Sequence, residues 1–535
     1  MPKATSAADR IAVLEQQVAA IIGERDQLIA QRDQYKKLYL DMLELCRKLE
    51  RGILGQKREK LPSGEEQLTL DVLGMLLGGQ PTPPPETEQV KAHERAKPTG
   101  RKPLPENLPR VDVDVIPPEV QQKGLDAFEK IGEDVTETVE RRPASLVVVR
   151  VHKPKFVARD RERGGETRVL QSPPPELPIE RGIAGPGLLA DTVVKRWQDH
   201  LPLYRMERIF SREGLELARS TICGWHEELA RLAWAVVDAM WADALTAPYL
   251  CTDATGVLVQ ALEKCRAAHF FVVAAPERHV LFGYAQKHDS AAVDRLLAGY
   301  KGYLVADAHS VYDHLYKKKA VIEVGCWAHN RRYFFKALTS DPERARTALA
   351  YIKALFKLER AHATATPEVR LRMRQQEARP IVEAFFAWCE SEQPRLLDET
   401  PIAKAVGYAL NQRVALSRFL EDGRLPIHNN FSEGQLRREA IGRKNWIFLG
   451  SDEGGETNAT FVSLLASCQL HEIEPLGYLR DLFCLLPSWP KSRALELAPA
   501  YWRQTLEDPE TQRRLSDNVY RQASLGAPVP QQITL

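Results

Sequence analysis

Two short stretches, YLCTD at residues 249–253 and GYLVAD at residues 302–307, decide the fold that this chain is expected to adopt. Each stretch is an apolar run that ends in an aspartate, Asp253 in the first and Asp307 in the second. Such a run predicts a buried strand with a carboxylate just past its last apolar residue. If the two strands are neighbours in one sheet, the two carboxylates converge at the same edge.

The segments around these strands complete the pattern of a mixed sheet. We expect, in chain order after the first strand, strands at 270–274 and 279–284, a helix at 290–298, the second aspartate strand, a short helix and a strand at 320–325. This is the order of an RNase H-like α/β sheet, and we assign its first part to residues 246–338. Residues 339–420 are helical in composition and form an insertion. Residues 421–485 supply the second part of the core, and residues 486–535 form a tail.

Length, charge and cysteine usage exclude several classes of protein. At 535 residues the chain is too long for one core, so a multidomain protein is expected. The formal net charge is only +2, so affinity for nucleic acid has to come from local basic patches. No run of about 18 apolar residues predicts a membrane span, and the N-terminus lacks the apolar core of a signal peptide. The eight cysteines lie far apart, which favours reduced thiols and a cytoplasmic protein.

An apolar seven-residue repeat at 9–50 predicts an N-terminal coiled coil over residues 1–50. One seam consists of Leu14, Ile21, Leu28, Tyr35, Met42 and Leu49, and the other of Ile11, Val18, Arg25, Arg32, Tyr39 and Cys46. The two arginines would weaken the coil and restrict its register. The alternative is a single amphipathic helix that lies on another domain. A linker rich in proline, glycine and charged residues follows at 51–110, and a small β unit at 111–170.

Residues 171–245 have helical spacing in three short segments, the last of which would be capped by Ser220 or Thr221. Three short helices with a capped third helix fit a helix-turn-helix, which would place the third helix in the major groove of DNA. The alternative is a triplet of structural helices. The basic residues that we expect nearest to the duplex are Lys195, Arg196, Arg205 and Arg219.

A third carboxylate, Glu433, lies in the segment HNNFSE at 428–433, just inside an expected helix start. A third carboxylate is needed before a metal site is predicted, because a lone aspartate at a strand end is more often a turn cap. Three neighbouring carboxylates repel one another, and two divalent ions about 4 Å apart would relieve that repulsion and stabilise the attacking and leaving oxygens of a phosphoryl transfer. Hard oxygen ligands favour Mg²⁺ or Mn²⁺. Asp253, Asp307 and Glu433 are therefore predicted to be catalytic metal ligands.

Five segments resemble the transposases of the insertion-sequence-66 family. They are LERGILGQKREKLPSGEEQLTL at 49–70, RGIAGPGLLADTVVKRWQDHLPLYRMERIF at 181–210, YLVADAHSVYDHL at 303–315, VGCWAHNRRYF at 324–334 and IHNNFSEGQLRREAIGRKNWIFLGSDEGGETNATFVSLLASCQLHEIEPLGYLRDL at 427–482. Together they span nearly the whole chain in the family's order. The resemblance implies an RNase H-like core with an Asp-Asp-Glu (DDE) triad, which Asp253, Asp307 and Glu433 match.

The chain departs from the family at two places. His428 stands where the family usually has aspartate, which bears on how the helix that carries Glu433 begins. Family members also commonly carry a cysteine-rich zinc ribbon, but residues 111–170 contain no cysteine and only one histidine, His152. A closed zinc site needs about four such ligands. The β unit is therefore expected to bind no zinc.

The segment CWAH, which ends in His329, has the spacing of a metal motif but only two ligands. It resembles a short Cys/His motif beyond the second aspartate of several DDE transposases. This resemblance implies that His329 contacts the scissile phosphate, and the alternative is a buried, hydrogen-bonded histidine. Arg331 and Arg332 beside it are predicted phosphate contacts, with a solvated pair as the alternative.

A basic strip is expected on the helix after Glu433, with Arg437, Arg443 and Lys444 as predicted DNA contacts. The alternative for Arg437 is a helix ion pair with Glu433, four residues earlier. Trp446, which follows the strip, would stack on an unpaired base or be buried.

The sequence therefore predicts a transposase that binds the ends of an insertion sequence and catalyses metal-dependent cleavage and strand transfer of DNA. Its expected partners are transposon-end DNA, target DNA, a second copy of the chain and accessory proteins of the same element, in the cytoplasm at the nucleoid and away from membranes. The first alternative is a catalytically inactive, transposase-derived DNA-binding regulator. The second is a structure-specific nuclease on the same fold.

Overall fold

The computed structural model describes residues 7–53 and 104–526, apart from 105, 107, 143–144, 159–168, 263 and 318–319, and it describes side chains of the first segment only at 16–40 and 42. Within these residues the protein is mostly helical, with one four-stranded and one five-stranded sheet. The chain divides into two compact units. One consists of Met1–Ala96 with Val324–His428, and the other of Lys97–Glu323 with Asn429–Leu535.

The first unit contains only helices among its described residues. Helix α1 (Ala7–Ile53) is 47 residues long, yet no described helix of the chain is both long and apolar enough to cross a membrane. The other helices are α9 (Trp327–Ala337), α10 (Pro342–Ala361), α11 (Pro367–Met373), α12 (Arg379–Glu392), α13 (Pro401–Asn411) and α14 (Arg413–Ser417). Their core surrounds the Trp327 ring, which contacts Phe385 and Phe419 and donates from Nε1 to the Leu416 carbonyl at 2.8 Å.

The second unit is built on a five-stranded sheet of the order β7-β6-β5-β8-β9. Its elements are β5 (Tyr249–Val259), β6 (Arg266–Ala275), β7 (His279–Ala285), α7 (Ser290–Leu296), β8 (Gly302–Val305), α8 (Asp313–Lys317) and β9 (Val321–Val324). Strands β5, β6 and β7 form an antiparallel meander, and β8 pairs with β5 in parallel. The predicted order of strands and helices is confirmed, whereas the RNase H-like assignment stays a prediction.

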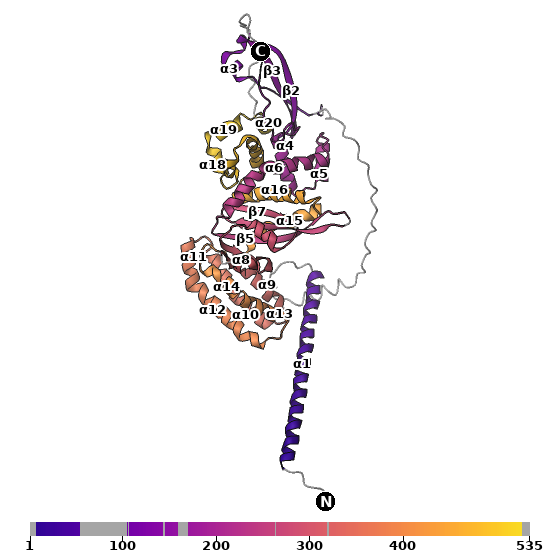
Figure 1. Ribbon diagram of the computed structural model, residues 1–535, viewed down its shortest axis with the longest axis vertical. Helices are drawn as coiled ribbons and strands as arrows, with labels where there is room; N and C mark the ends of the chain where they lie inside the picture. The colour runs from indigo at the N-terminus through magenta and orange to yellow at the C-terminus, as the bar shows by residue number, and fades with distance from the viewer. Residues whose placement is uncertain are drawn as a thin grey trace. The chain divides into compact units, whose positions relative to one another are not determined.

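Two helices from the C-terminal part of the chain pack on this sheet, α15 (Asn430–Trp446) against β5 and α16 (Asp452–Leu470) against β7 (Figure 1). The edge strand β7 is covered by serine hydroxyls of α16. Phe282 N donates to Ser463 Oγ at 2.8 Å, and Val280 N donates to Ser467 Oγ at 3.0 Å. Residues four apart lie on one face of a helix, so both serine hydroxyls face β7. They accept the hydrogen bonds that a neighbouring strand would otherwise accept along this edge.

Three helices occupy the segment predicted to be a helix-turn-helix, namely α4 (Pro186–Trp197), α5 (Leu203–Arg212) and α6 (Arg219–Ala244). The third helix is not short, since it runs for 26 residues, and Ala218 stands at its N-cap without a side-chain hydrogen bond. The predicted cap by Ser220 or Thr221 is therefore wrong. Both residues lie inside the first turn, past the position from which a hydroxyl serves the free N–H groups.

The second sheet is formed by β1 (Arg110–Asp114), β2 (Phe128–Arg142), β3 (Ser145–Ala158) and β4 (Val169–Gln171), with α3 (Pro118–Lys123) after β1. The remaining helices are α17 (Pro475–Leu485), α18 (Trp502–Glu507), α19 (Pro509–Ser516) and α20 (Val519–Leu525). Helix α20 packs on this sheet, where Tyr520 joins the buried Val147 and Val149. Strand β2 also carries the buried Glu140, whose Oε1 accepts from Leu188 N at 2.7 Å and so caps the start of α4.

Candidate carboxylate site and nucleic-acid interface

The register of the parallel pair β5–β8 brings two of the predicted ligands to the same edge of the sheet. The last paired residues are Cys251 and Val305. Extending this register by two residues places Asp253 opposite Asp307, which lies two residues beyond the end of β8. Residues that face each other in neighbouring strands project to the same side of the sheet. The topology therefore brings the two aspartates together at one sheet edge.

A buried tyrosine lies near both aspartates. Tyr312, which is only 1% exposed, hydrogen bonds with the Thr252 side chain. Burial raises the pKa of Tyr312 far above its usual value, and the carboxylates of Asp307 and Asp253 add to the shift because they disfavour a phenolate beside them. The charges of both aspartates therefore affect the pKa of the Tyr312 phenol.

The third predicted ligand, Glu433, lies in the first turn of α15. Its N–H donates to the Asn429 carbonyl at 3.2 Å, and Asn429 Nδ2 donates to the Thr252 carbonyl at 2.8 Å. Asn429 also bonds the Ser432 hydroxyl through Oδ1. Because Thr252 directly precedes Asp253, one fully buried asparagine fastens the start of the helix that carries Glu433 to the strand that carries Asp253.

The other end of α15 is fastened to the same strand. Arg443 Nη1 donates to Thr255 Oγ1 at 2.9 Å and also bonds the Gly256 carbonyl. Beyond the helix, Leu449 N donates to the Leu258 carbonyl at 2.8 Å. With both ends fixed, α15 runs along β5, so Glu433 stays near the part of the strand that carries Asp253. Strand β5 continues beyond Asp253 to Val259, so this aspartate lies within the strand and not just past its end, where the sequence predicted it.

The donor set of Asp253, Asp307 and Glu433 fits hard divalent cations. All three residues are half-buried, so their oxygens are partly shielded from water and still accessible to an ion. Within the described part of the chain, no group of three or more histidine, cysteine, aspartate or glutamate side chains is already gathered to hold a metal ion. Carboxylates without cations repel one another. Their role as metal ligands rests on the placement of β5, β8 and α15 and stays a prediction.

Two of the predicted DNA contacts, Lys195 and Arg196 on α4, are engaged within the protein. Lys195 Nζ lies 2.6 Å from Asp191 Oδ2 and 4.8 Å from the centroid of the Phe210 ring. Arg196 lies 5.6 Å from the centroid of the Trp446 ring on α15, and burial lowers the pKa of its guanidinium to about 10. Trp446 therefore packs against an arginine of α4. Contact of Lys195 and Arg196 with DNA stays a prediction.

A chain of hydrogen bonds links α4 to α15 through α16. Trp197 Nε1 donates to Asn458 Oδ1 at 2.6 Å, and Asn458 Nδ2 donates to Glu439 Oε1 at 2.7 Å. Burial raises the pKa of Glu439 to about 7, although the hydrogen bond from Asn458 and the charge of Arg196 oppose this shift. The helix that carries the third carboxylate is thus bound to α4 on one side and to β5 on the other.

Four other basic candidates of the second unit are more accessible, whereas the predicted contact Arg443 is half-buried and bonded to β5. Arg205, Arg219, Arg437 and Lys444 are exposed, and Arg219 forms an ion pair with Glu207 at 3.2 Å. Exposed arginines and lysines can neutralise DNA phosphates without first losing a buried partner.

His329, Arg331 and Arg332 lie on α9 of the first unit, whereas the three carboxylates lie in the second. The Arg331 guanidinium lies 5.5 Å from the centroid of the Phe335 ring. Contact of these three residues with a scissile phosphate stays a prediction.

Three histidines beside Asp307 were not among the residues predicted from the sequence. The ring of His288 lies 5.2 Å from that of His269 and 4.5 Å from that of His309, measured between centroids. Burial lowers the pKa of His288, the other two histidines lower it further, and Asp307 opposes the shift. In the sequence, only His309 could have indicated this cluster, because it lies two residues after Asp307. The contacts of His269 and His288 depend on how distant segments pack.

Family models identify the class of protein that this sheet and these carboxylates define. A model described as "Transposase IS66 family" matches residues 181–457, more than half of the chain. The match includes β5, β8 and the start of α15. The chain belongs to the IS66 transposase family. A second model, described as "Transposase C of IS166 homeodomain", matches residues 41–113, most of which lie outside the described residues.

Relatives are found in Sinorhizobium fredii. The uncharacterized protein y4hP is 28% identical over 490 residues, which cover 85% of this chain and 88% of that protein. The uncharacterized protein y4qI is 32% identical over 431 residues, covering 75% of this chain and 77% of that protein. The similarity therefore extends over most of both chains.

Proposed function

We propose that this protein is a DDE transposase that binds the ends of an insertion sequence and catalyses metal-dependent cleavage and strand transfer of DNA. Membership of the IS66 transposase family supports transposition. The strand order and the parallel β5–β8 pair support an RNase H-like core. The match of residues 41–113 to a homeodomain-like model supports DNA as the partner.

The observation that carries the residue assignment is the convergence of three segments at one edge of the sheet. The register of β5 and β8 sets Asp253 opposite Asp307, and the bond from Asn429 to Thr252 brings the first turn of α15 to the same place. Glu433 lies in that turn. Three carboxylates from elements distant in sequence are what a metal-dependent DNA transferase requires.

Asp253, Asp307 and Glu433 would hold two Mg²⁺ or Mn²⁺ ions, which stabilise the charge that develops on the attacking and leaving oxygens. The chain itself positions these ligands. The β5–β8 pair holds the aspartates, and Asn429 and Arg443 hold α15 along β5. The exposed Arg437 and Lys444 on the same helix would contact the DNA backbone.

The proposal is tested by strand cleavage with Mg²⁺ on duplexes that carry the ends of the protein's own element. Asp253→Asn, Asp307→Asn and Glu433→Gln should each abolish cleavage and retain binding to the ends, because they remove a ligand charge at nearly constant size. Glu421→Gln is the control, since the Glu421 carboxylate forms an ion pair with the neighbouring Arg418, at 2.8 Å.

Two results would contradict this assignment. Strand transfer retained by Glu433→Gln but lost in Glu421→Gln or Glu439→Gln would mean that a different glutamate is the third ligand. End binding without cleavage by the unaltered protein would favour the alternative function, a catalytically inactive DNA-binding regulator.

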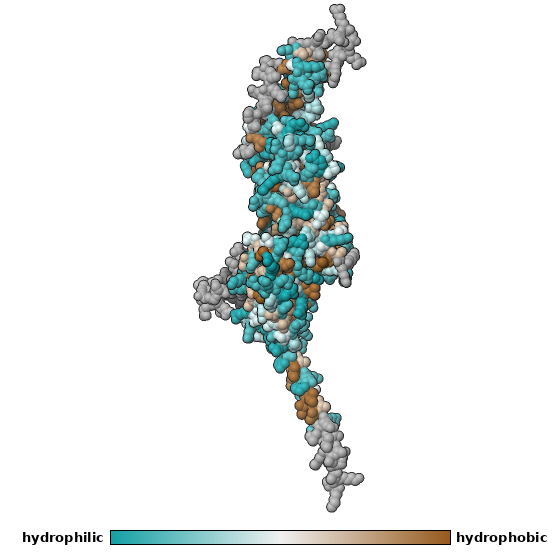
Figure 2. All heavy atoms as spheres, turned by 90° about the vertical axis from the view of Figure 1, so that its left-hand side faces the viewer, coloured by the Kyte–Doolittle hydropathy of each residue, from teal (hydrophilic) through white to brown (hydrophobic). Residues whose placement is uncertain are grey.

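We also propose that α1 pairs with a second copy of the chain. Among the side chains that the structure describes on α1, a hydrophobic stripe is exposed, with exposed fractions of 65% for Ile21, 60% for Leu28 and 73% for Tyr35. Figure 2 shows hydrophobic side chains along this helix. A hollow of about 380 Å³ lies along α1, lined by Ile21, Glu24, Arg25, Leu28, Ile29 and Arg32.

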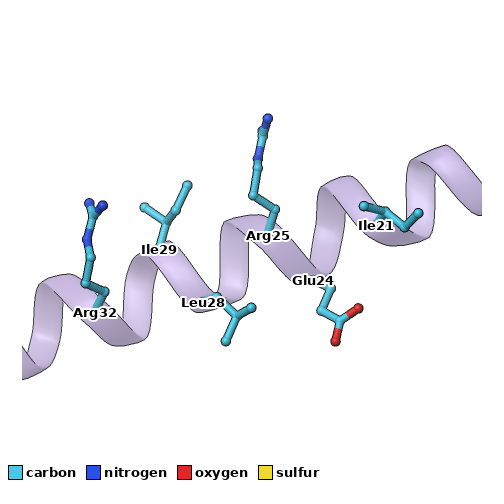
Figure 3. A pocket seen from close by; sticks show the side chains of 6 residues that line it. All are labelled: Ile21, Glu24, Arg25, Leu28, Ile29 and Arg32. Atoms are coloured by element: carbon cyan, nitrogen blue, oxygen red, sulfur yellow. The ribbon is translucent and has the colours of Figure 1, made fainter.

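The spacing of the residues that line the hollow is compatible with knobs-into-holes packing. Figure 3 shows its six side chains on successive turns, with Arg25, Ile29 and Arg32 extending to one side and Glu24 and Leu28 to the other. In a heptad repeat, four such residues form the hole that receives one side chain of a partner helix. Two copies brought together in this way would hold two transposon ends.

A further inference from the structure

The three histidines beside Asp307 form a stack of rings that leads from the sheet to the solvent. His269 lies on β6, His288 follows β7, and His309 follows β8. The rings of His269 and His288 are stacked, at 25° between planes, and those of His288 and His309 are tilted by 49°. Phe271 contacts the middle ring, with 5.2 Å between centroids. We call His269, His288 and His309 the histidine stack.

The outer end of the histidine stack is open. His309 is exposed, and its Nδ1 accepts a long hydrogen bond from Val311 N at 3.4 Å; this bond lies in the plane of the ring and covers neither face. The inner rings are only half-exposed. An aromatic column with one free face is a surface on which another flat ring can be added.

Packing alone does not account for histidine at these positions. Within the described residues, His269 Nδ1 and His288 Nε2 are buried without a hydrogen-bond partner. Burying a polar nitrogen in this way costs free energy, and phenylalanine, which occupies the neighbouring position 271, would fill such space without that cost. Histidine at these positions therefore indicates a role beyond packing.

Coordination of a metal ion is not that role, because the rings of His269 and His288 are stacked and do not turn their nitrogens toward a common point. In the part of the chain that the structure describes, no three histidine, cysteine, aspartate or glutamate side chains are arranged to hold a metal. A phosphate group alone is also disfavoured, since the Asp307 carboxylate acts on His288 from close by. A neutral, flat, aromatic group fits both the shape and the charge.

We propose that the histidine stack receives an unpaired DNA base next to the phosphate that is cut, with the base stacking on the free face of His309. This inference rests on the proposed function, which places a scissile phosphate at Asp307. Two extended residues span at most about 7 Å, and successive bases are about 3.4 Å apart along a strand. The stacked base therefore belongs to a nucleotide within about two positions of that phosphate. Stacking tolerates every base, so the site holds a strand end without reading its sequence.

The test uses the full chain without divalent ions and a duplex whose single-stranded 3′ overhang carries 2-aminopurine, whose fluorescence is quenched when it stacks. We expect quenching on binding, together with tighter binding of the overhang duplex than of a blunt duplex. His309→Ala should abolish the quenching and weaken overhang binding between about 5-fold and about 150-fold. His309→Phe should restore both, since it keeps an aromatic face.

The matched control is His314→Ala, because His314 is a neighbouring histidine that pairs with Asp294 at 2.8 Å and lies outside the stack. It should behave as the unaltered protein. The inference is overturned if His309→Ala and His309→Phe bind alike, or if the overhang neither quenches nor binds more tightly. The fluorescence measurement needs no metal, so it can be separated from the cleavage assay. A protein that stacks the base but does not cleave DNA would contradict only the proposed catalytic function. A protein that cleaves DNA but does not stack the base would contradict only this inference.

Discussion

Replacing Asn429 by alanine tests whether α15 is positioned by its bond to β5. The substitution removes the Nδ2–H donor that serves the Thr252 carbonyl at 2.8 Å, and it also removes the oxygen that bonds the Ser432 hydroxyl. Ser432 keeps a second acceptor, the backbone carbonyl of residue 429, at 3.1 Å. The main loss is therefore the link between the two elements that carry Glu433 and Asp253.

The magnitude follows from burial. Asn429 is 0% exposed and Thr252 is 1% exposed, so water cannot replace the lost donor. Removing one partner of such a buried bond costs about 1–3 kcal/mol. A domain of 150–250 residues loses about 2–4 °C of Tm for each kcal/mol, so Tm should fall by about 2–12 °C. Residues that orient metal ligands typically change metal affinity by about 10–100-fold when they are replaced.

The assay combines thermal unfolding with Mn²⁺ binding to the full chain, followed by electron paramagnetic resonance. Asn445→Ala is the matched control, because Asn445 lies on the same helix and its side-chain amide donates a long hydrogen bond within the helix, at 3.4 Å to the Ile441 carbonyl. Asn429→Asp should be worse than Asn429→Ala, since it sets an oxygen against the Thr252 carbonyl. If Asn429→Ala matches Asn445→Ala in both Tm and Mn²⁺ affinity, α15 is not positioned as we argue.

Four further predictions concern other parts of the chain. A purified fragment of residues 111–170 should contain no zinc by elemental analysis, and close to one zinc per chain would contradict this. Arg205→Ala and Arg219→Ala should weaken DNA binding for all sequences and flatten its salt dependence, whereas a footprint that survives deletion of residues 182–245 would exclude this segment. Burial raises the pKa of Glu140 from 4.5 to about 8, so the folded state holds the proton more tightly than the unfolded state. The stability of the fold should therefore fall as pH rises from about 4.5 to about 8. Glu140→Gln should flatten this pH dependence in thermal unfolding, and an unchanged pH dependence would refute the reasoning. Light scattering should give a lower mass per particle for a chain that lacks residues 1–50, and equal association of both chains would mean that this helix has another partner.

The strands around the two aspartates could be predicted because their signal is local. An apolar run of strand length that ends in a carboxylate is visible within six residues, and Asp253 and Asp307 both end such runs. Only Asp307 lies beyond its strand, because β5 continues through Asp253 to Val259. The start of α6 was predicted wrongly, although Ser220 and Thr221 are good capping residues. The helix begins where the backbone leaves the extended conformation, and that change occurs at Ala218.

The supports of the site could not be predicted in the same way. Asn429 and Thr252 are 177 residues apart, and their hydrogen bond exists only after α15 has packed along β5. The contacts of His288 likewise come from β6 and from the segment after β8. Residue type suggests what a side chain can bind, whereas the partner it meets is set by tertiary packing.

The basic residues of α4 show how burial determines the partners of a charge. Residues 186–193 are all buried, so most of this helix has no face toward solvent. A cation at its C-terminal end must then be paired within the protein, as Lys195 is with Asp191, or stacked on a ring, as Arg196 is on Trp446. Helix α4 therefore belongs to the support of α15. Within this segment, the DNA contacts that we propose fall to the exposed Arg205 on α5 and Arg219 on α6.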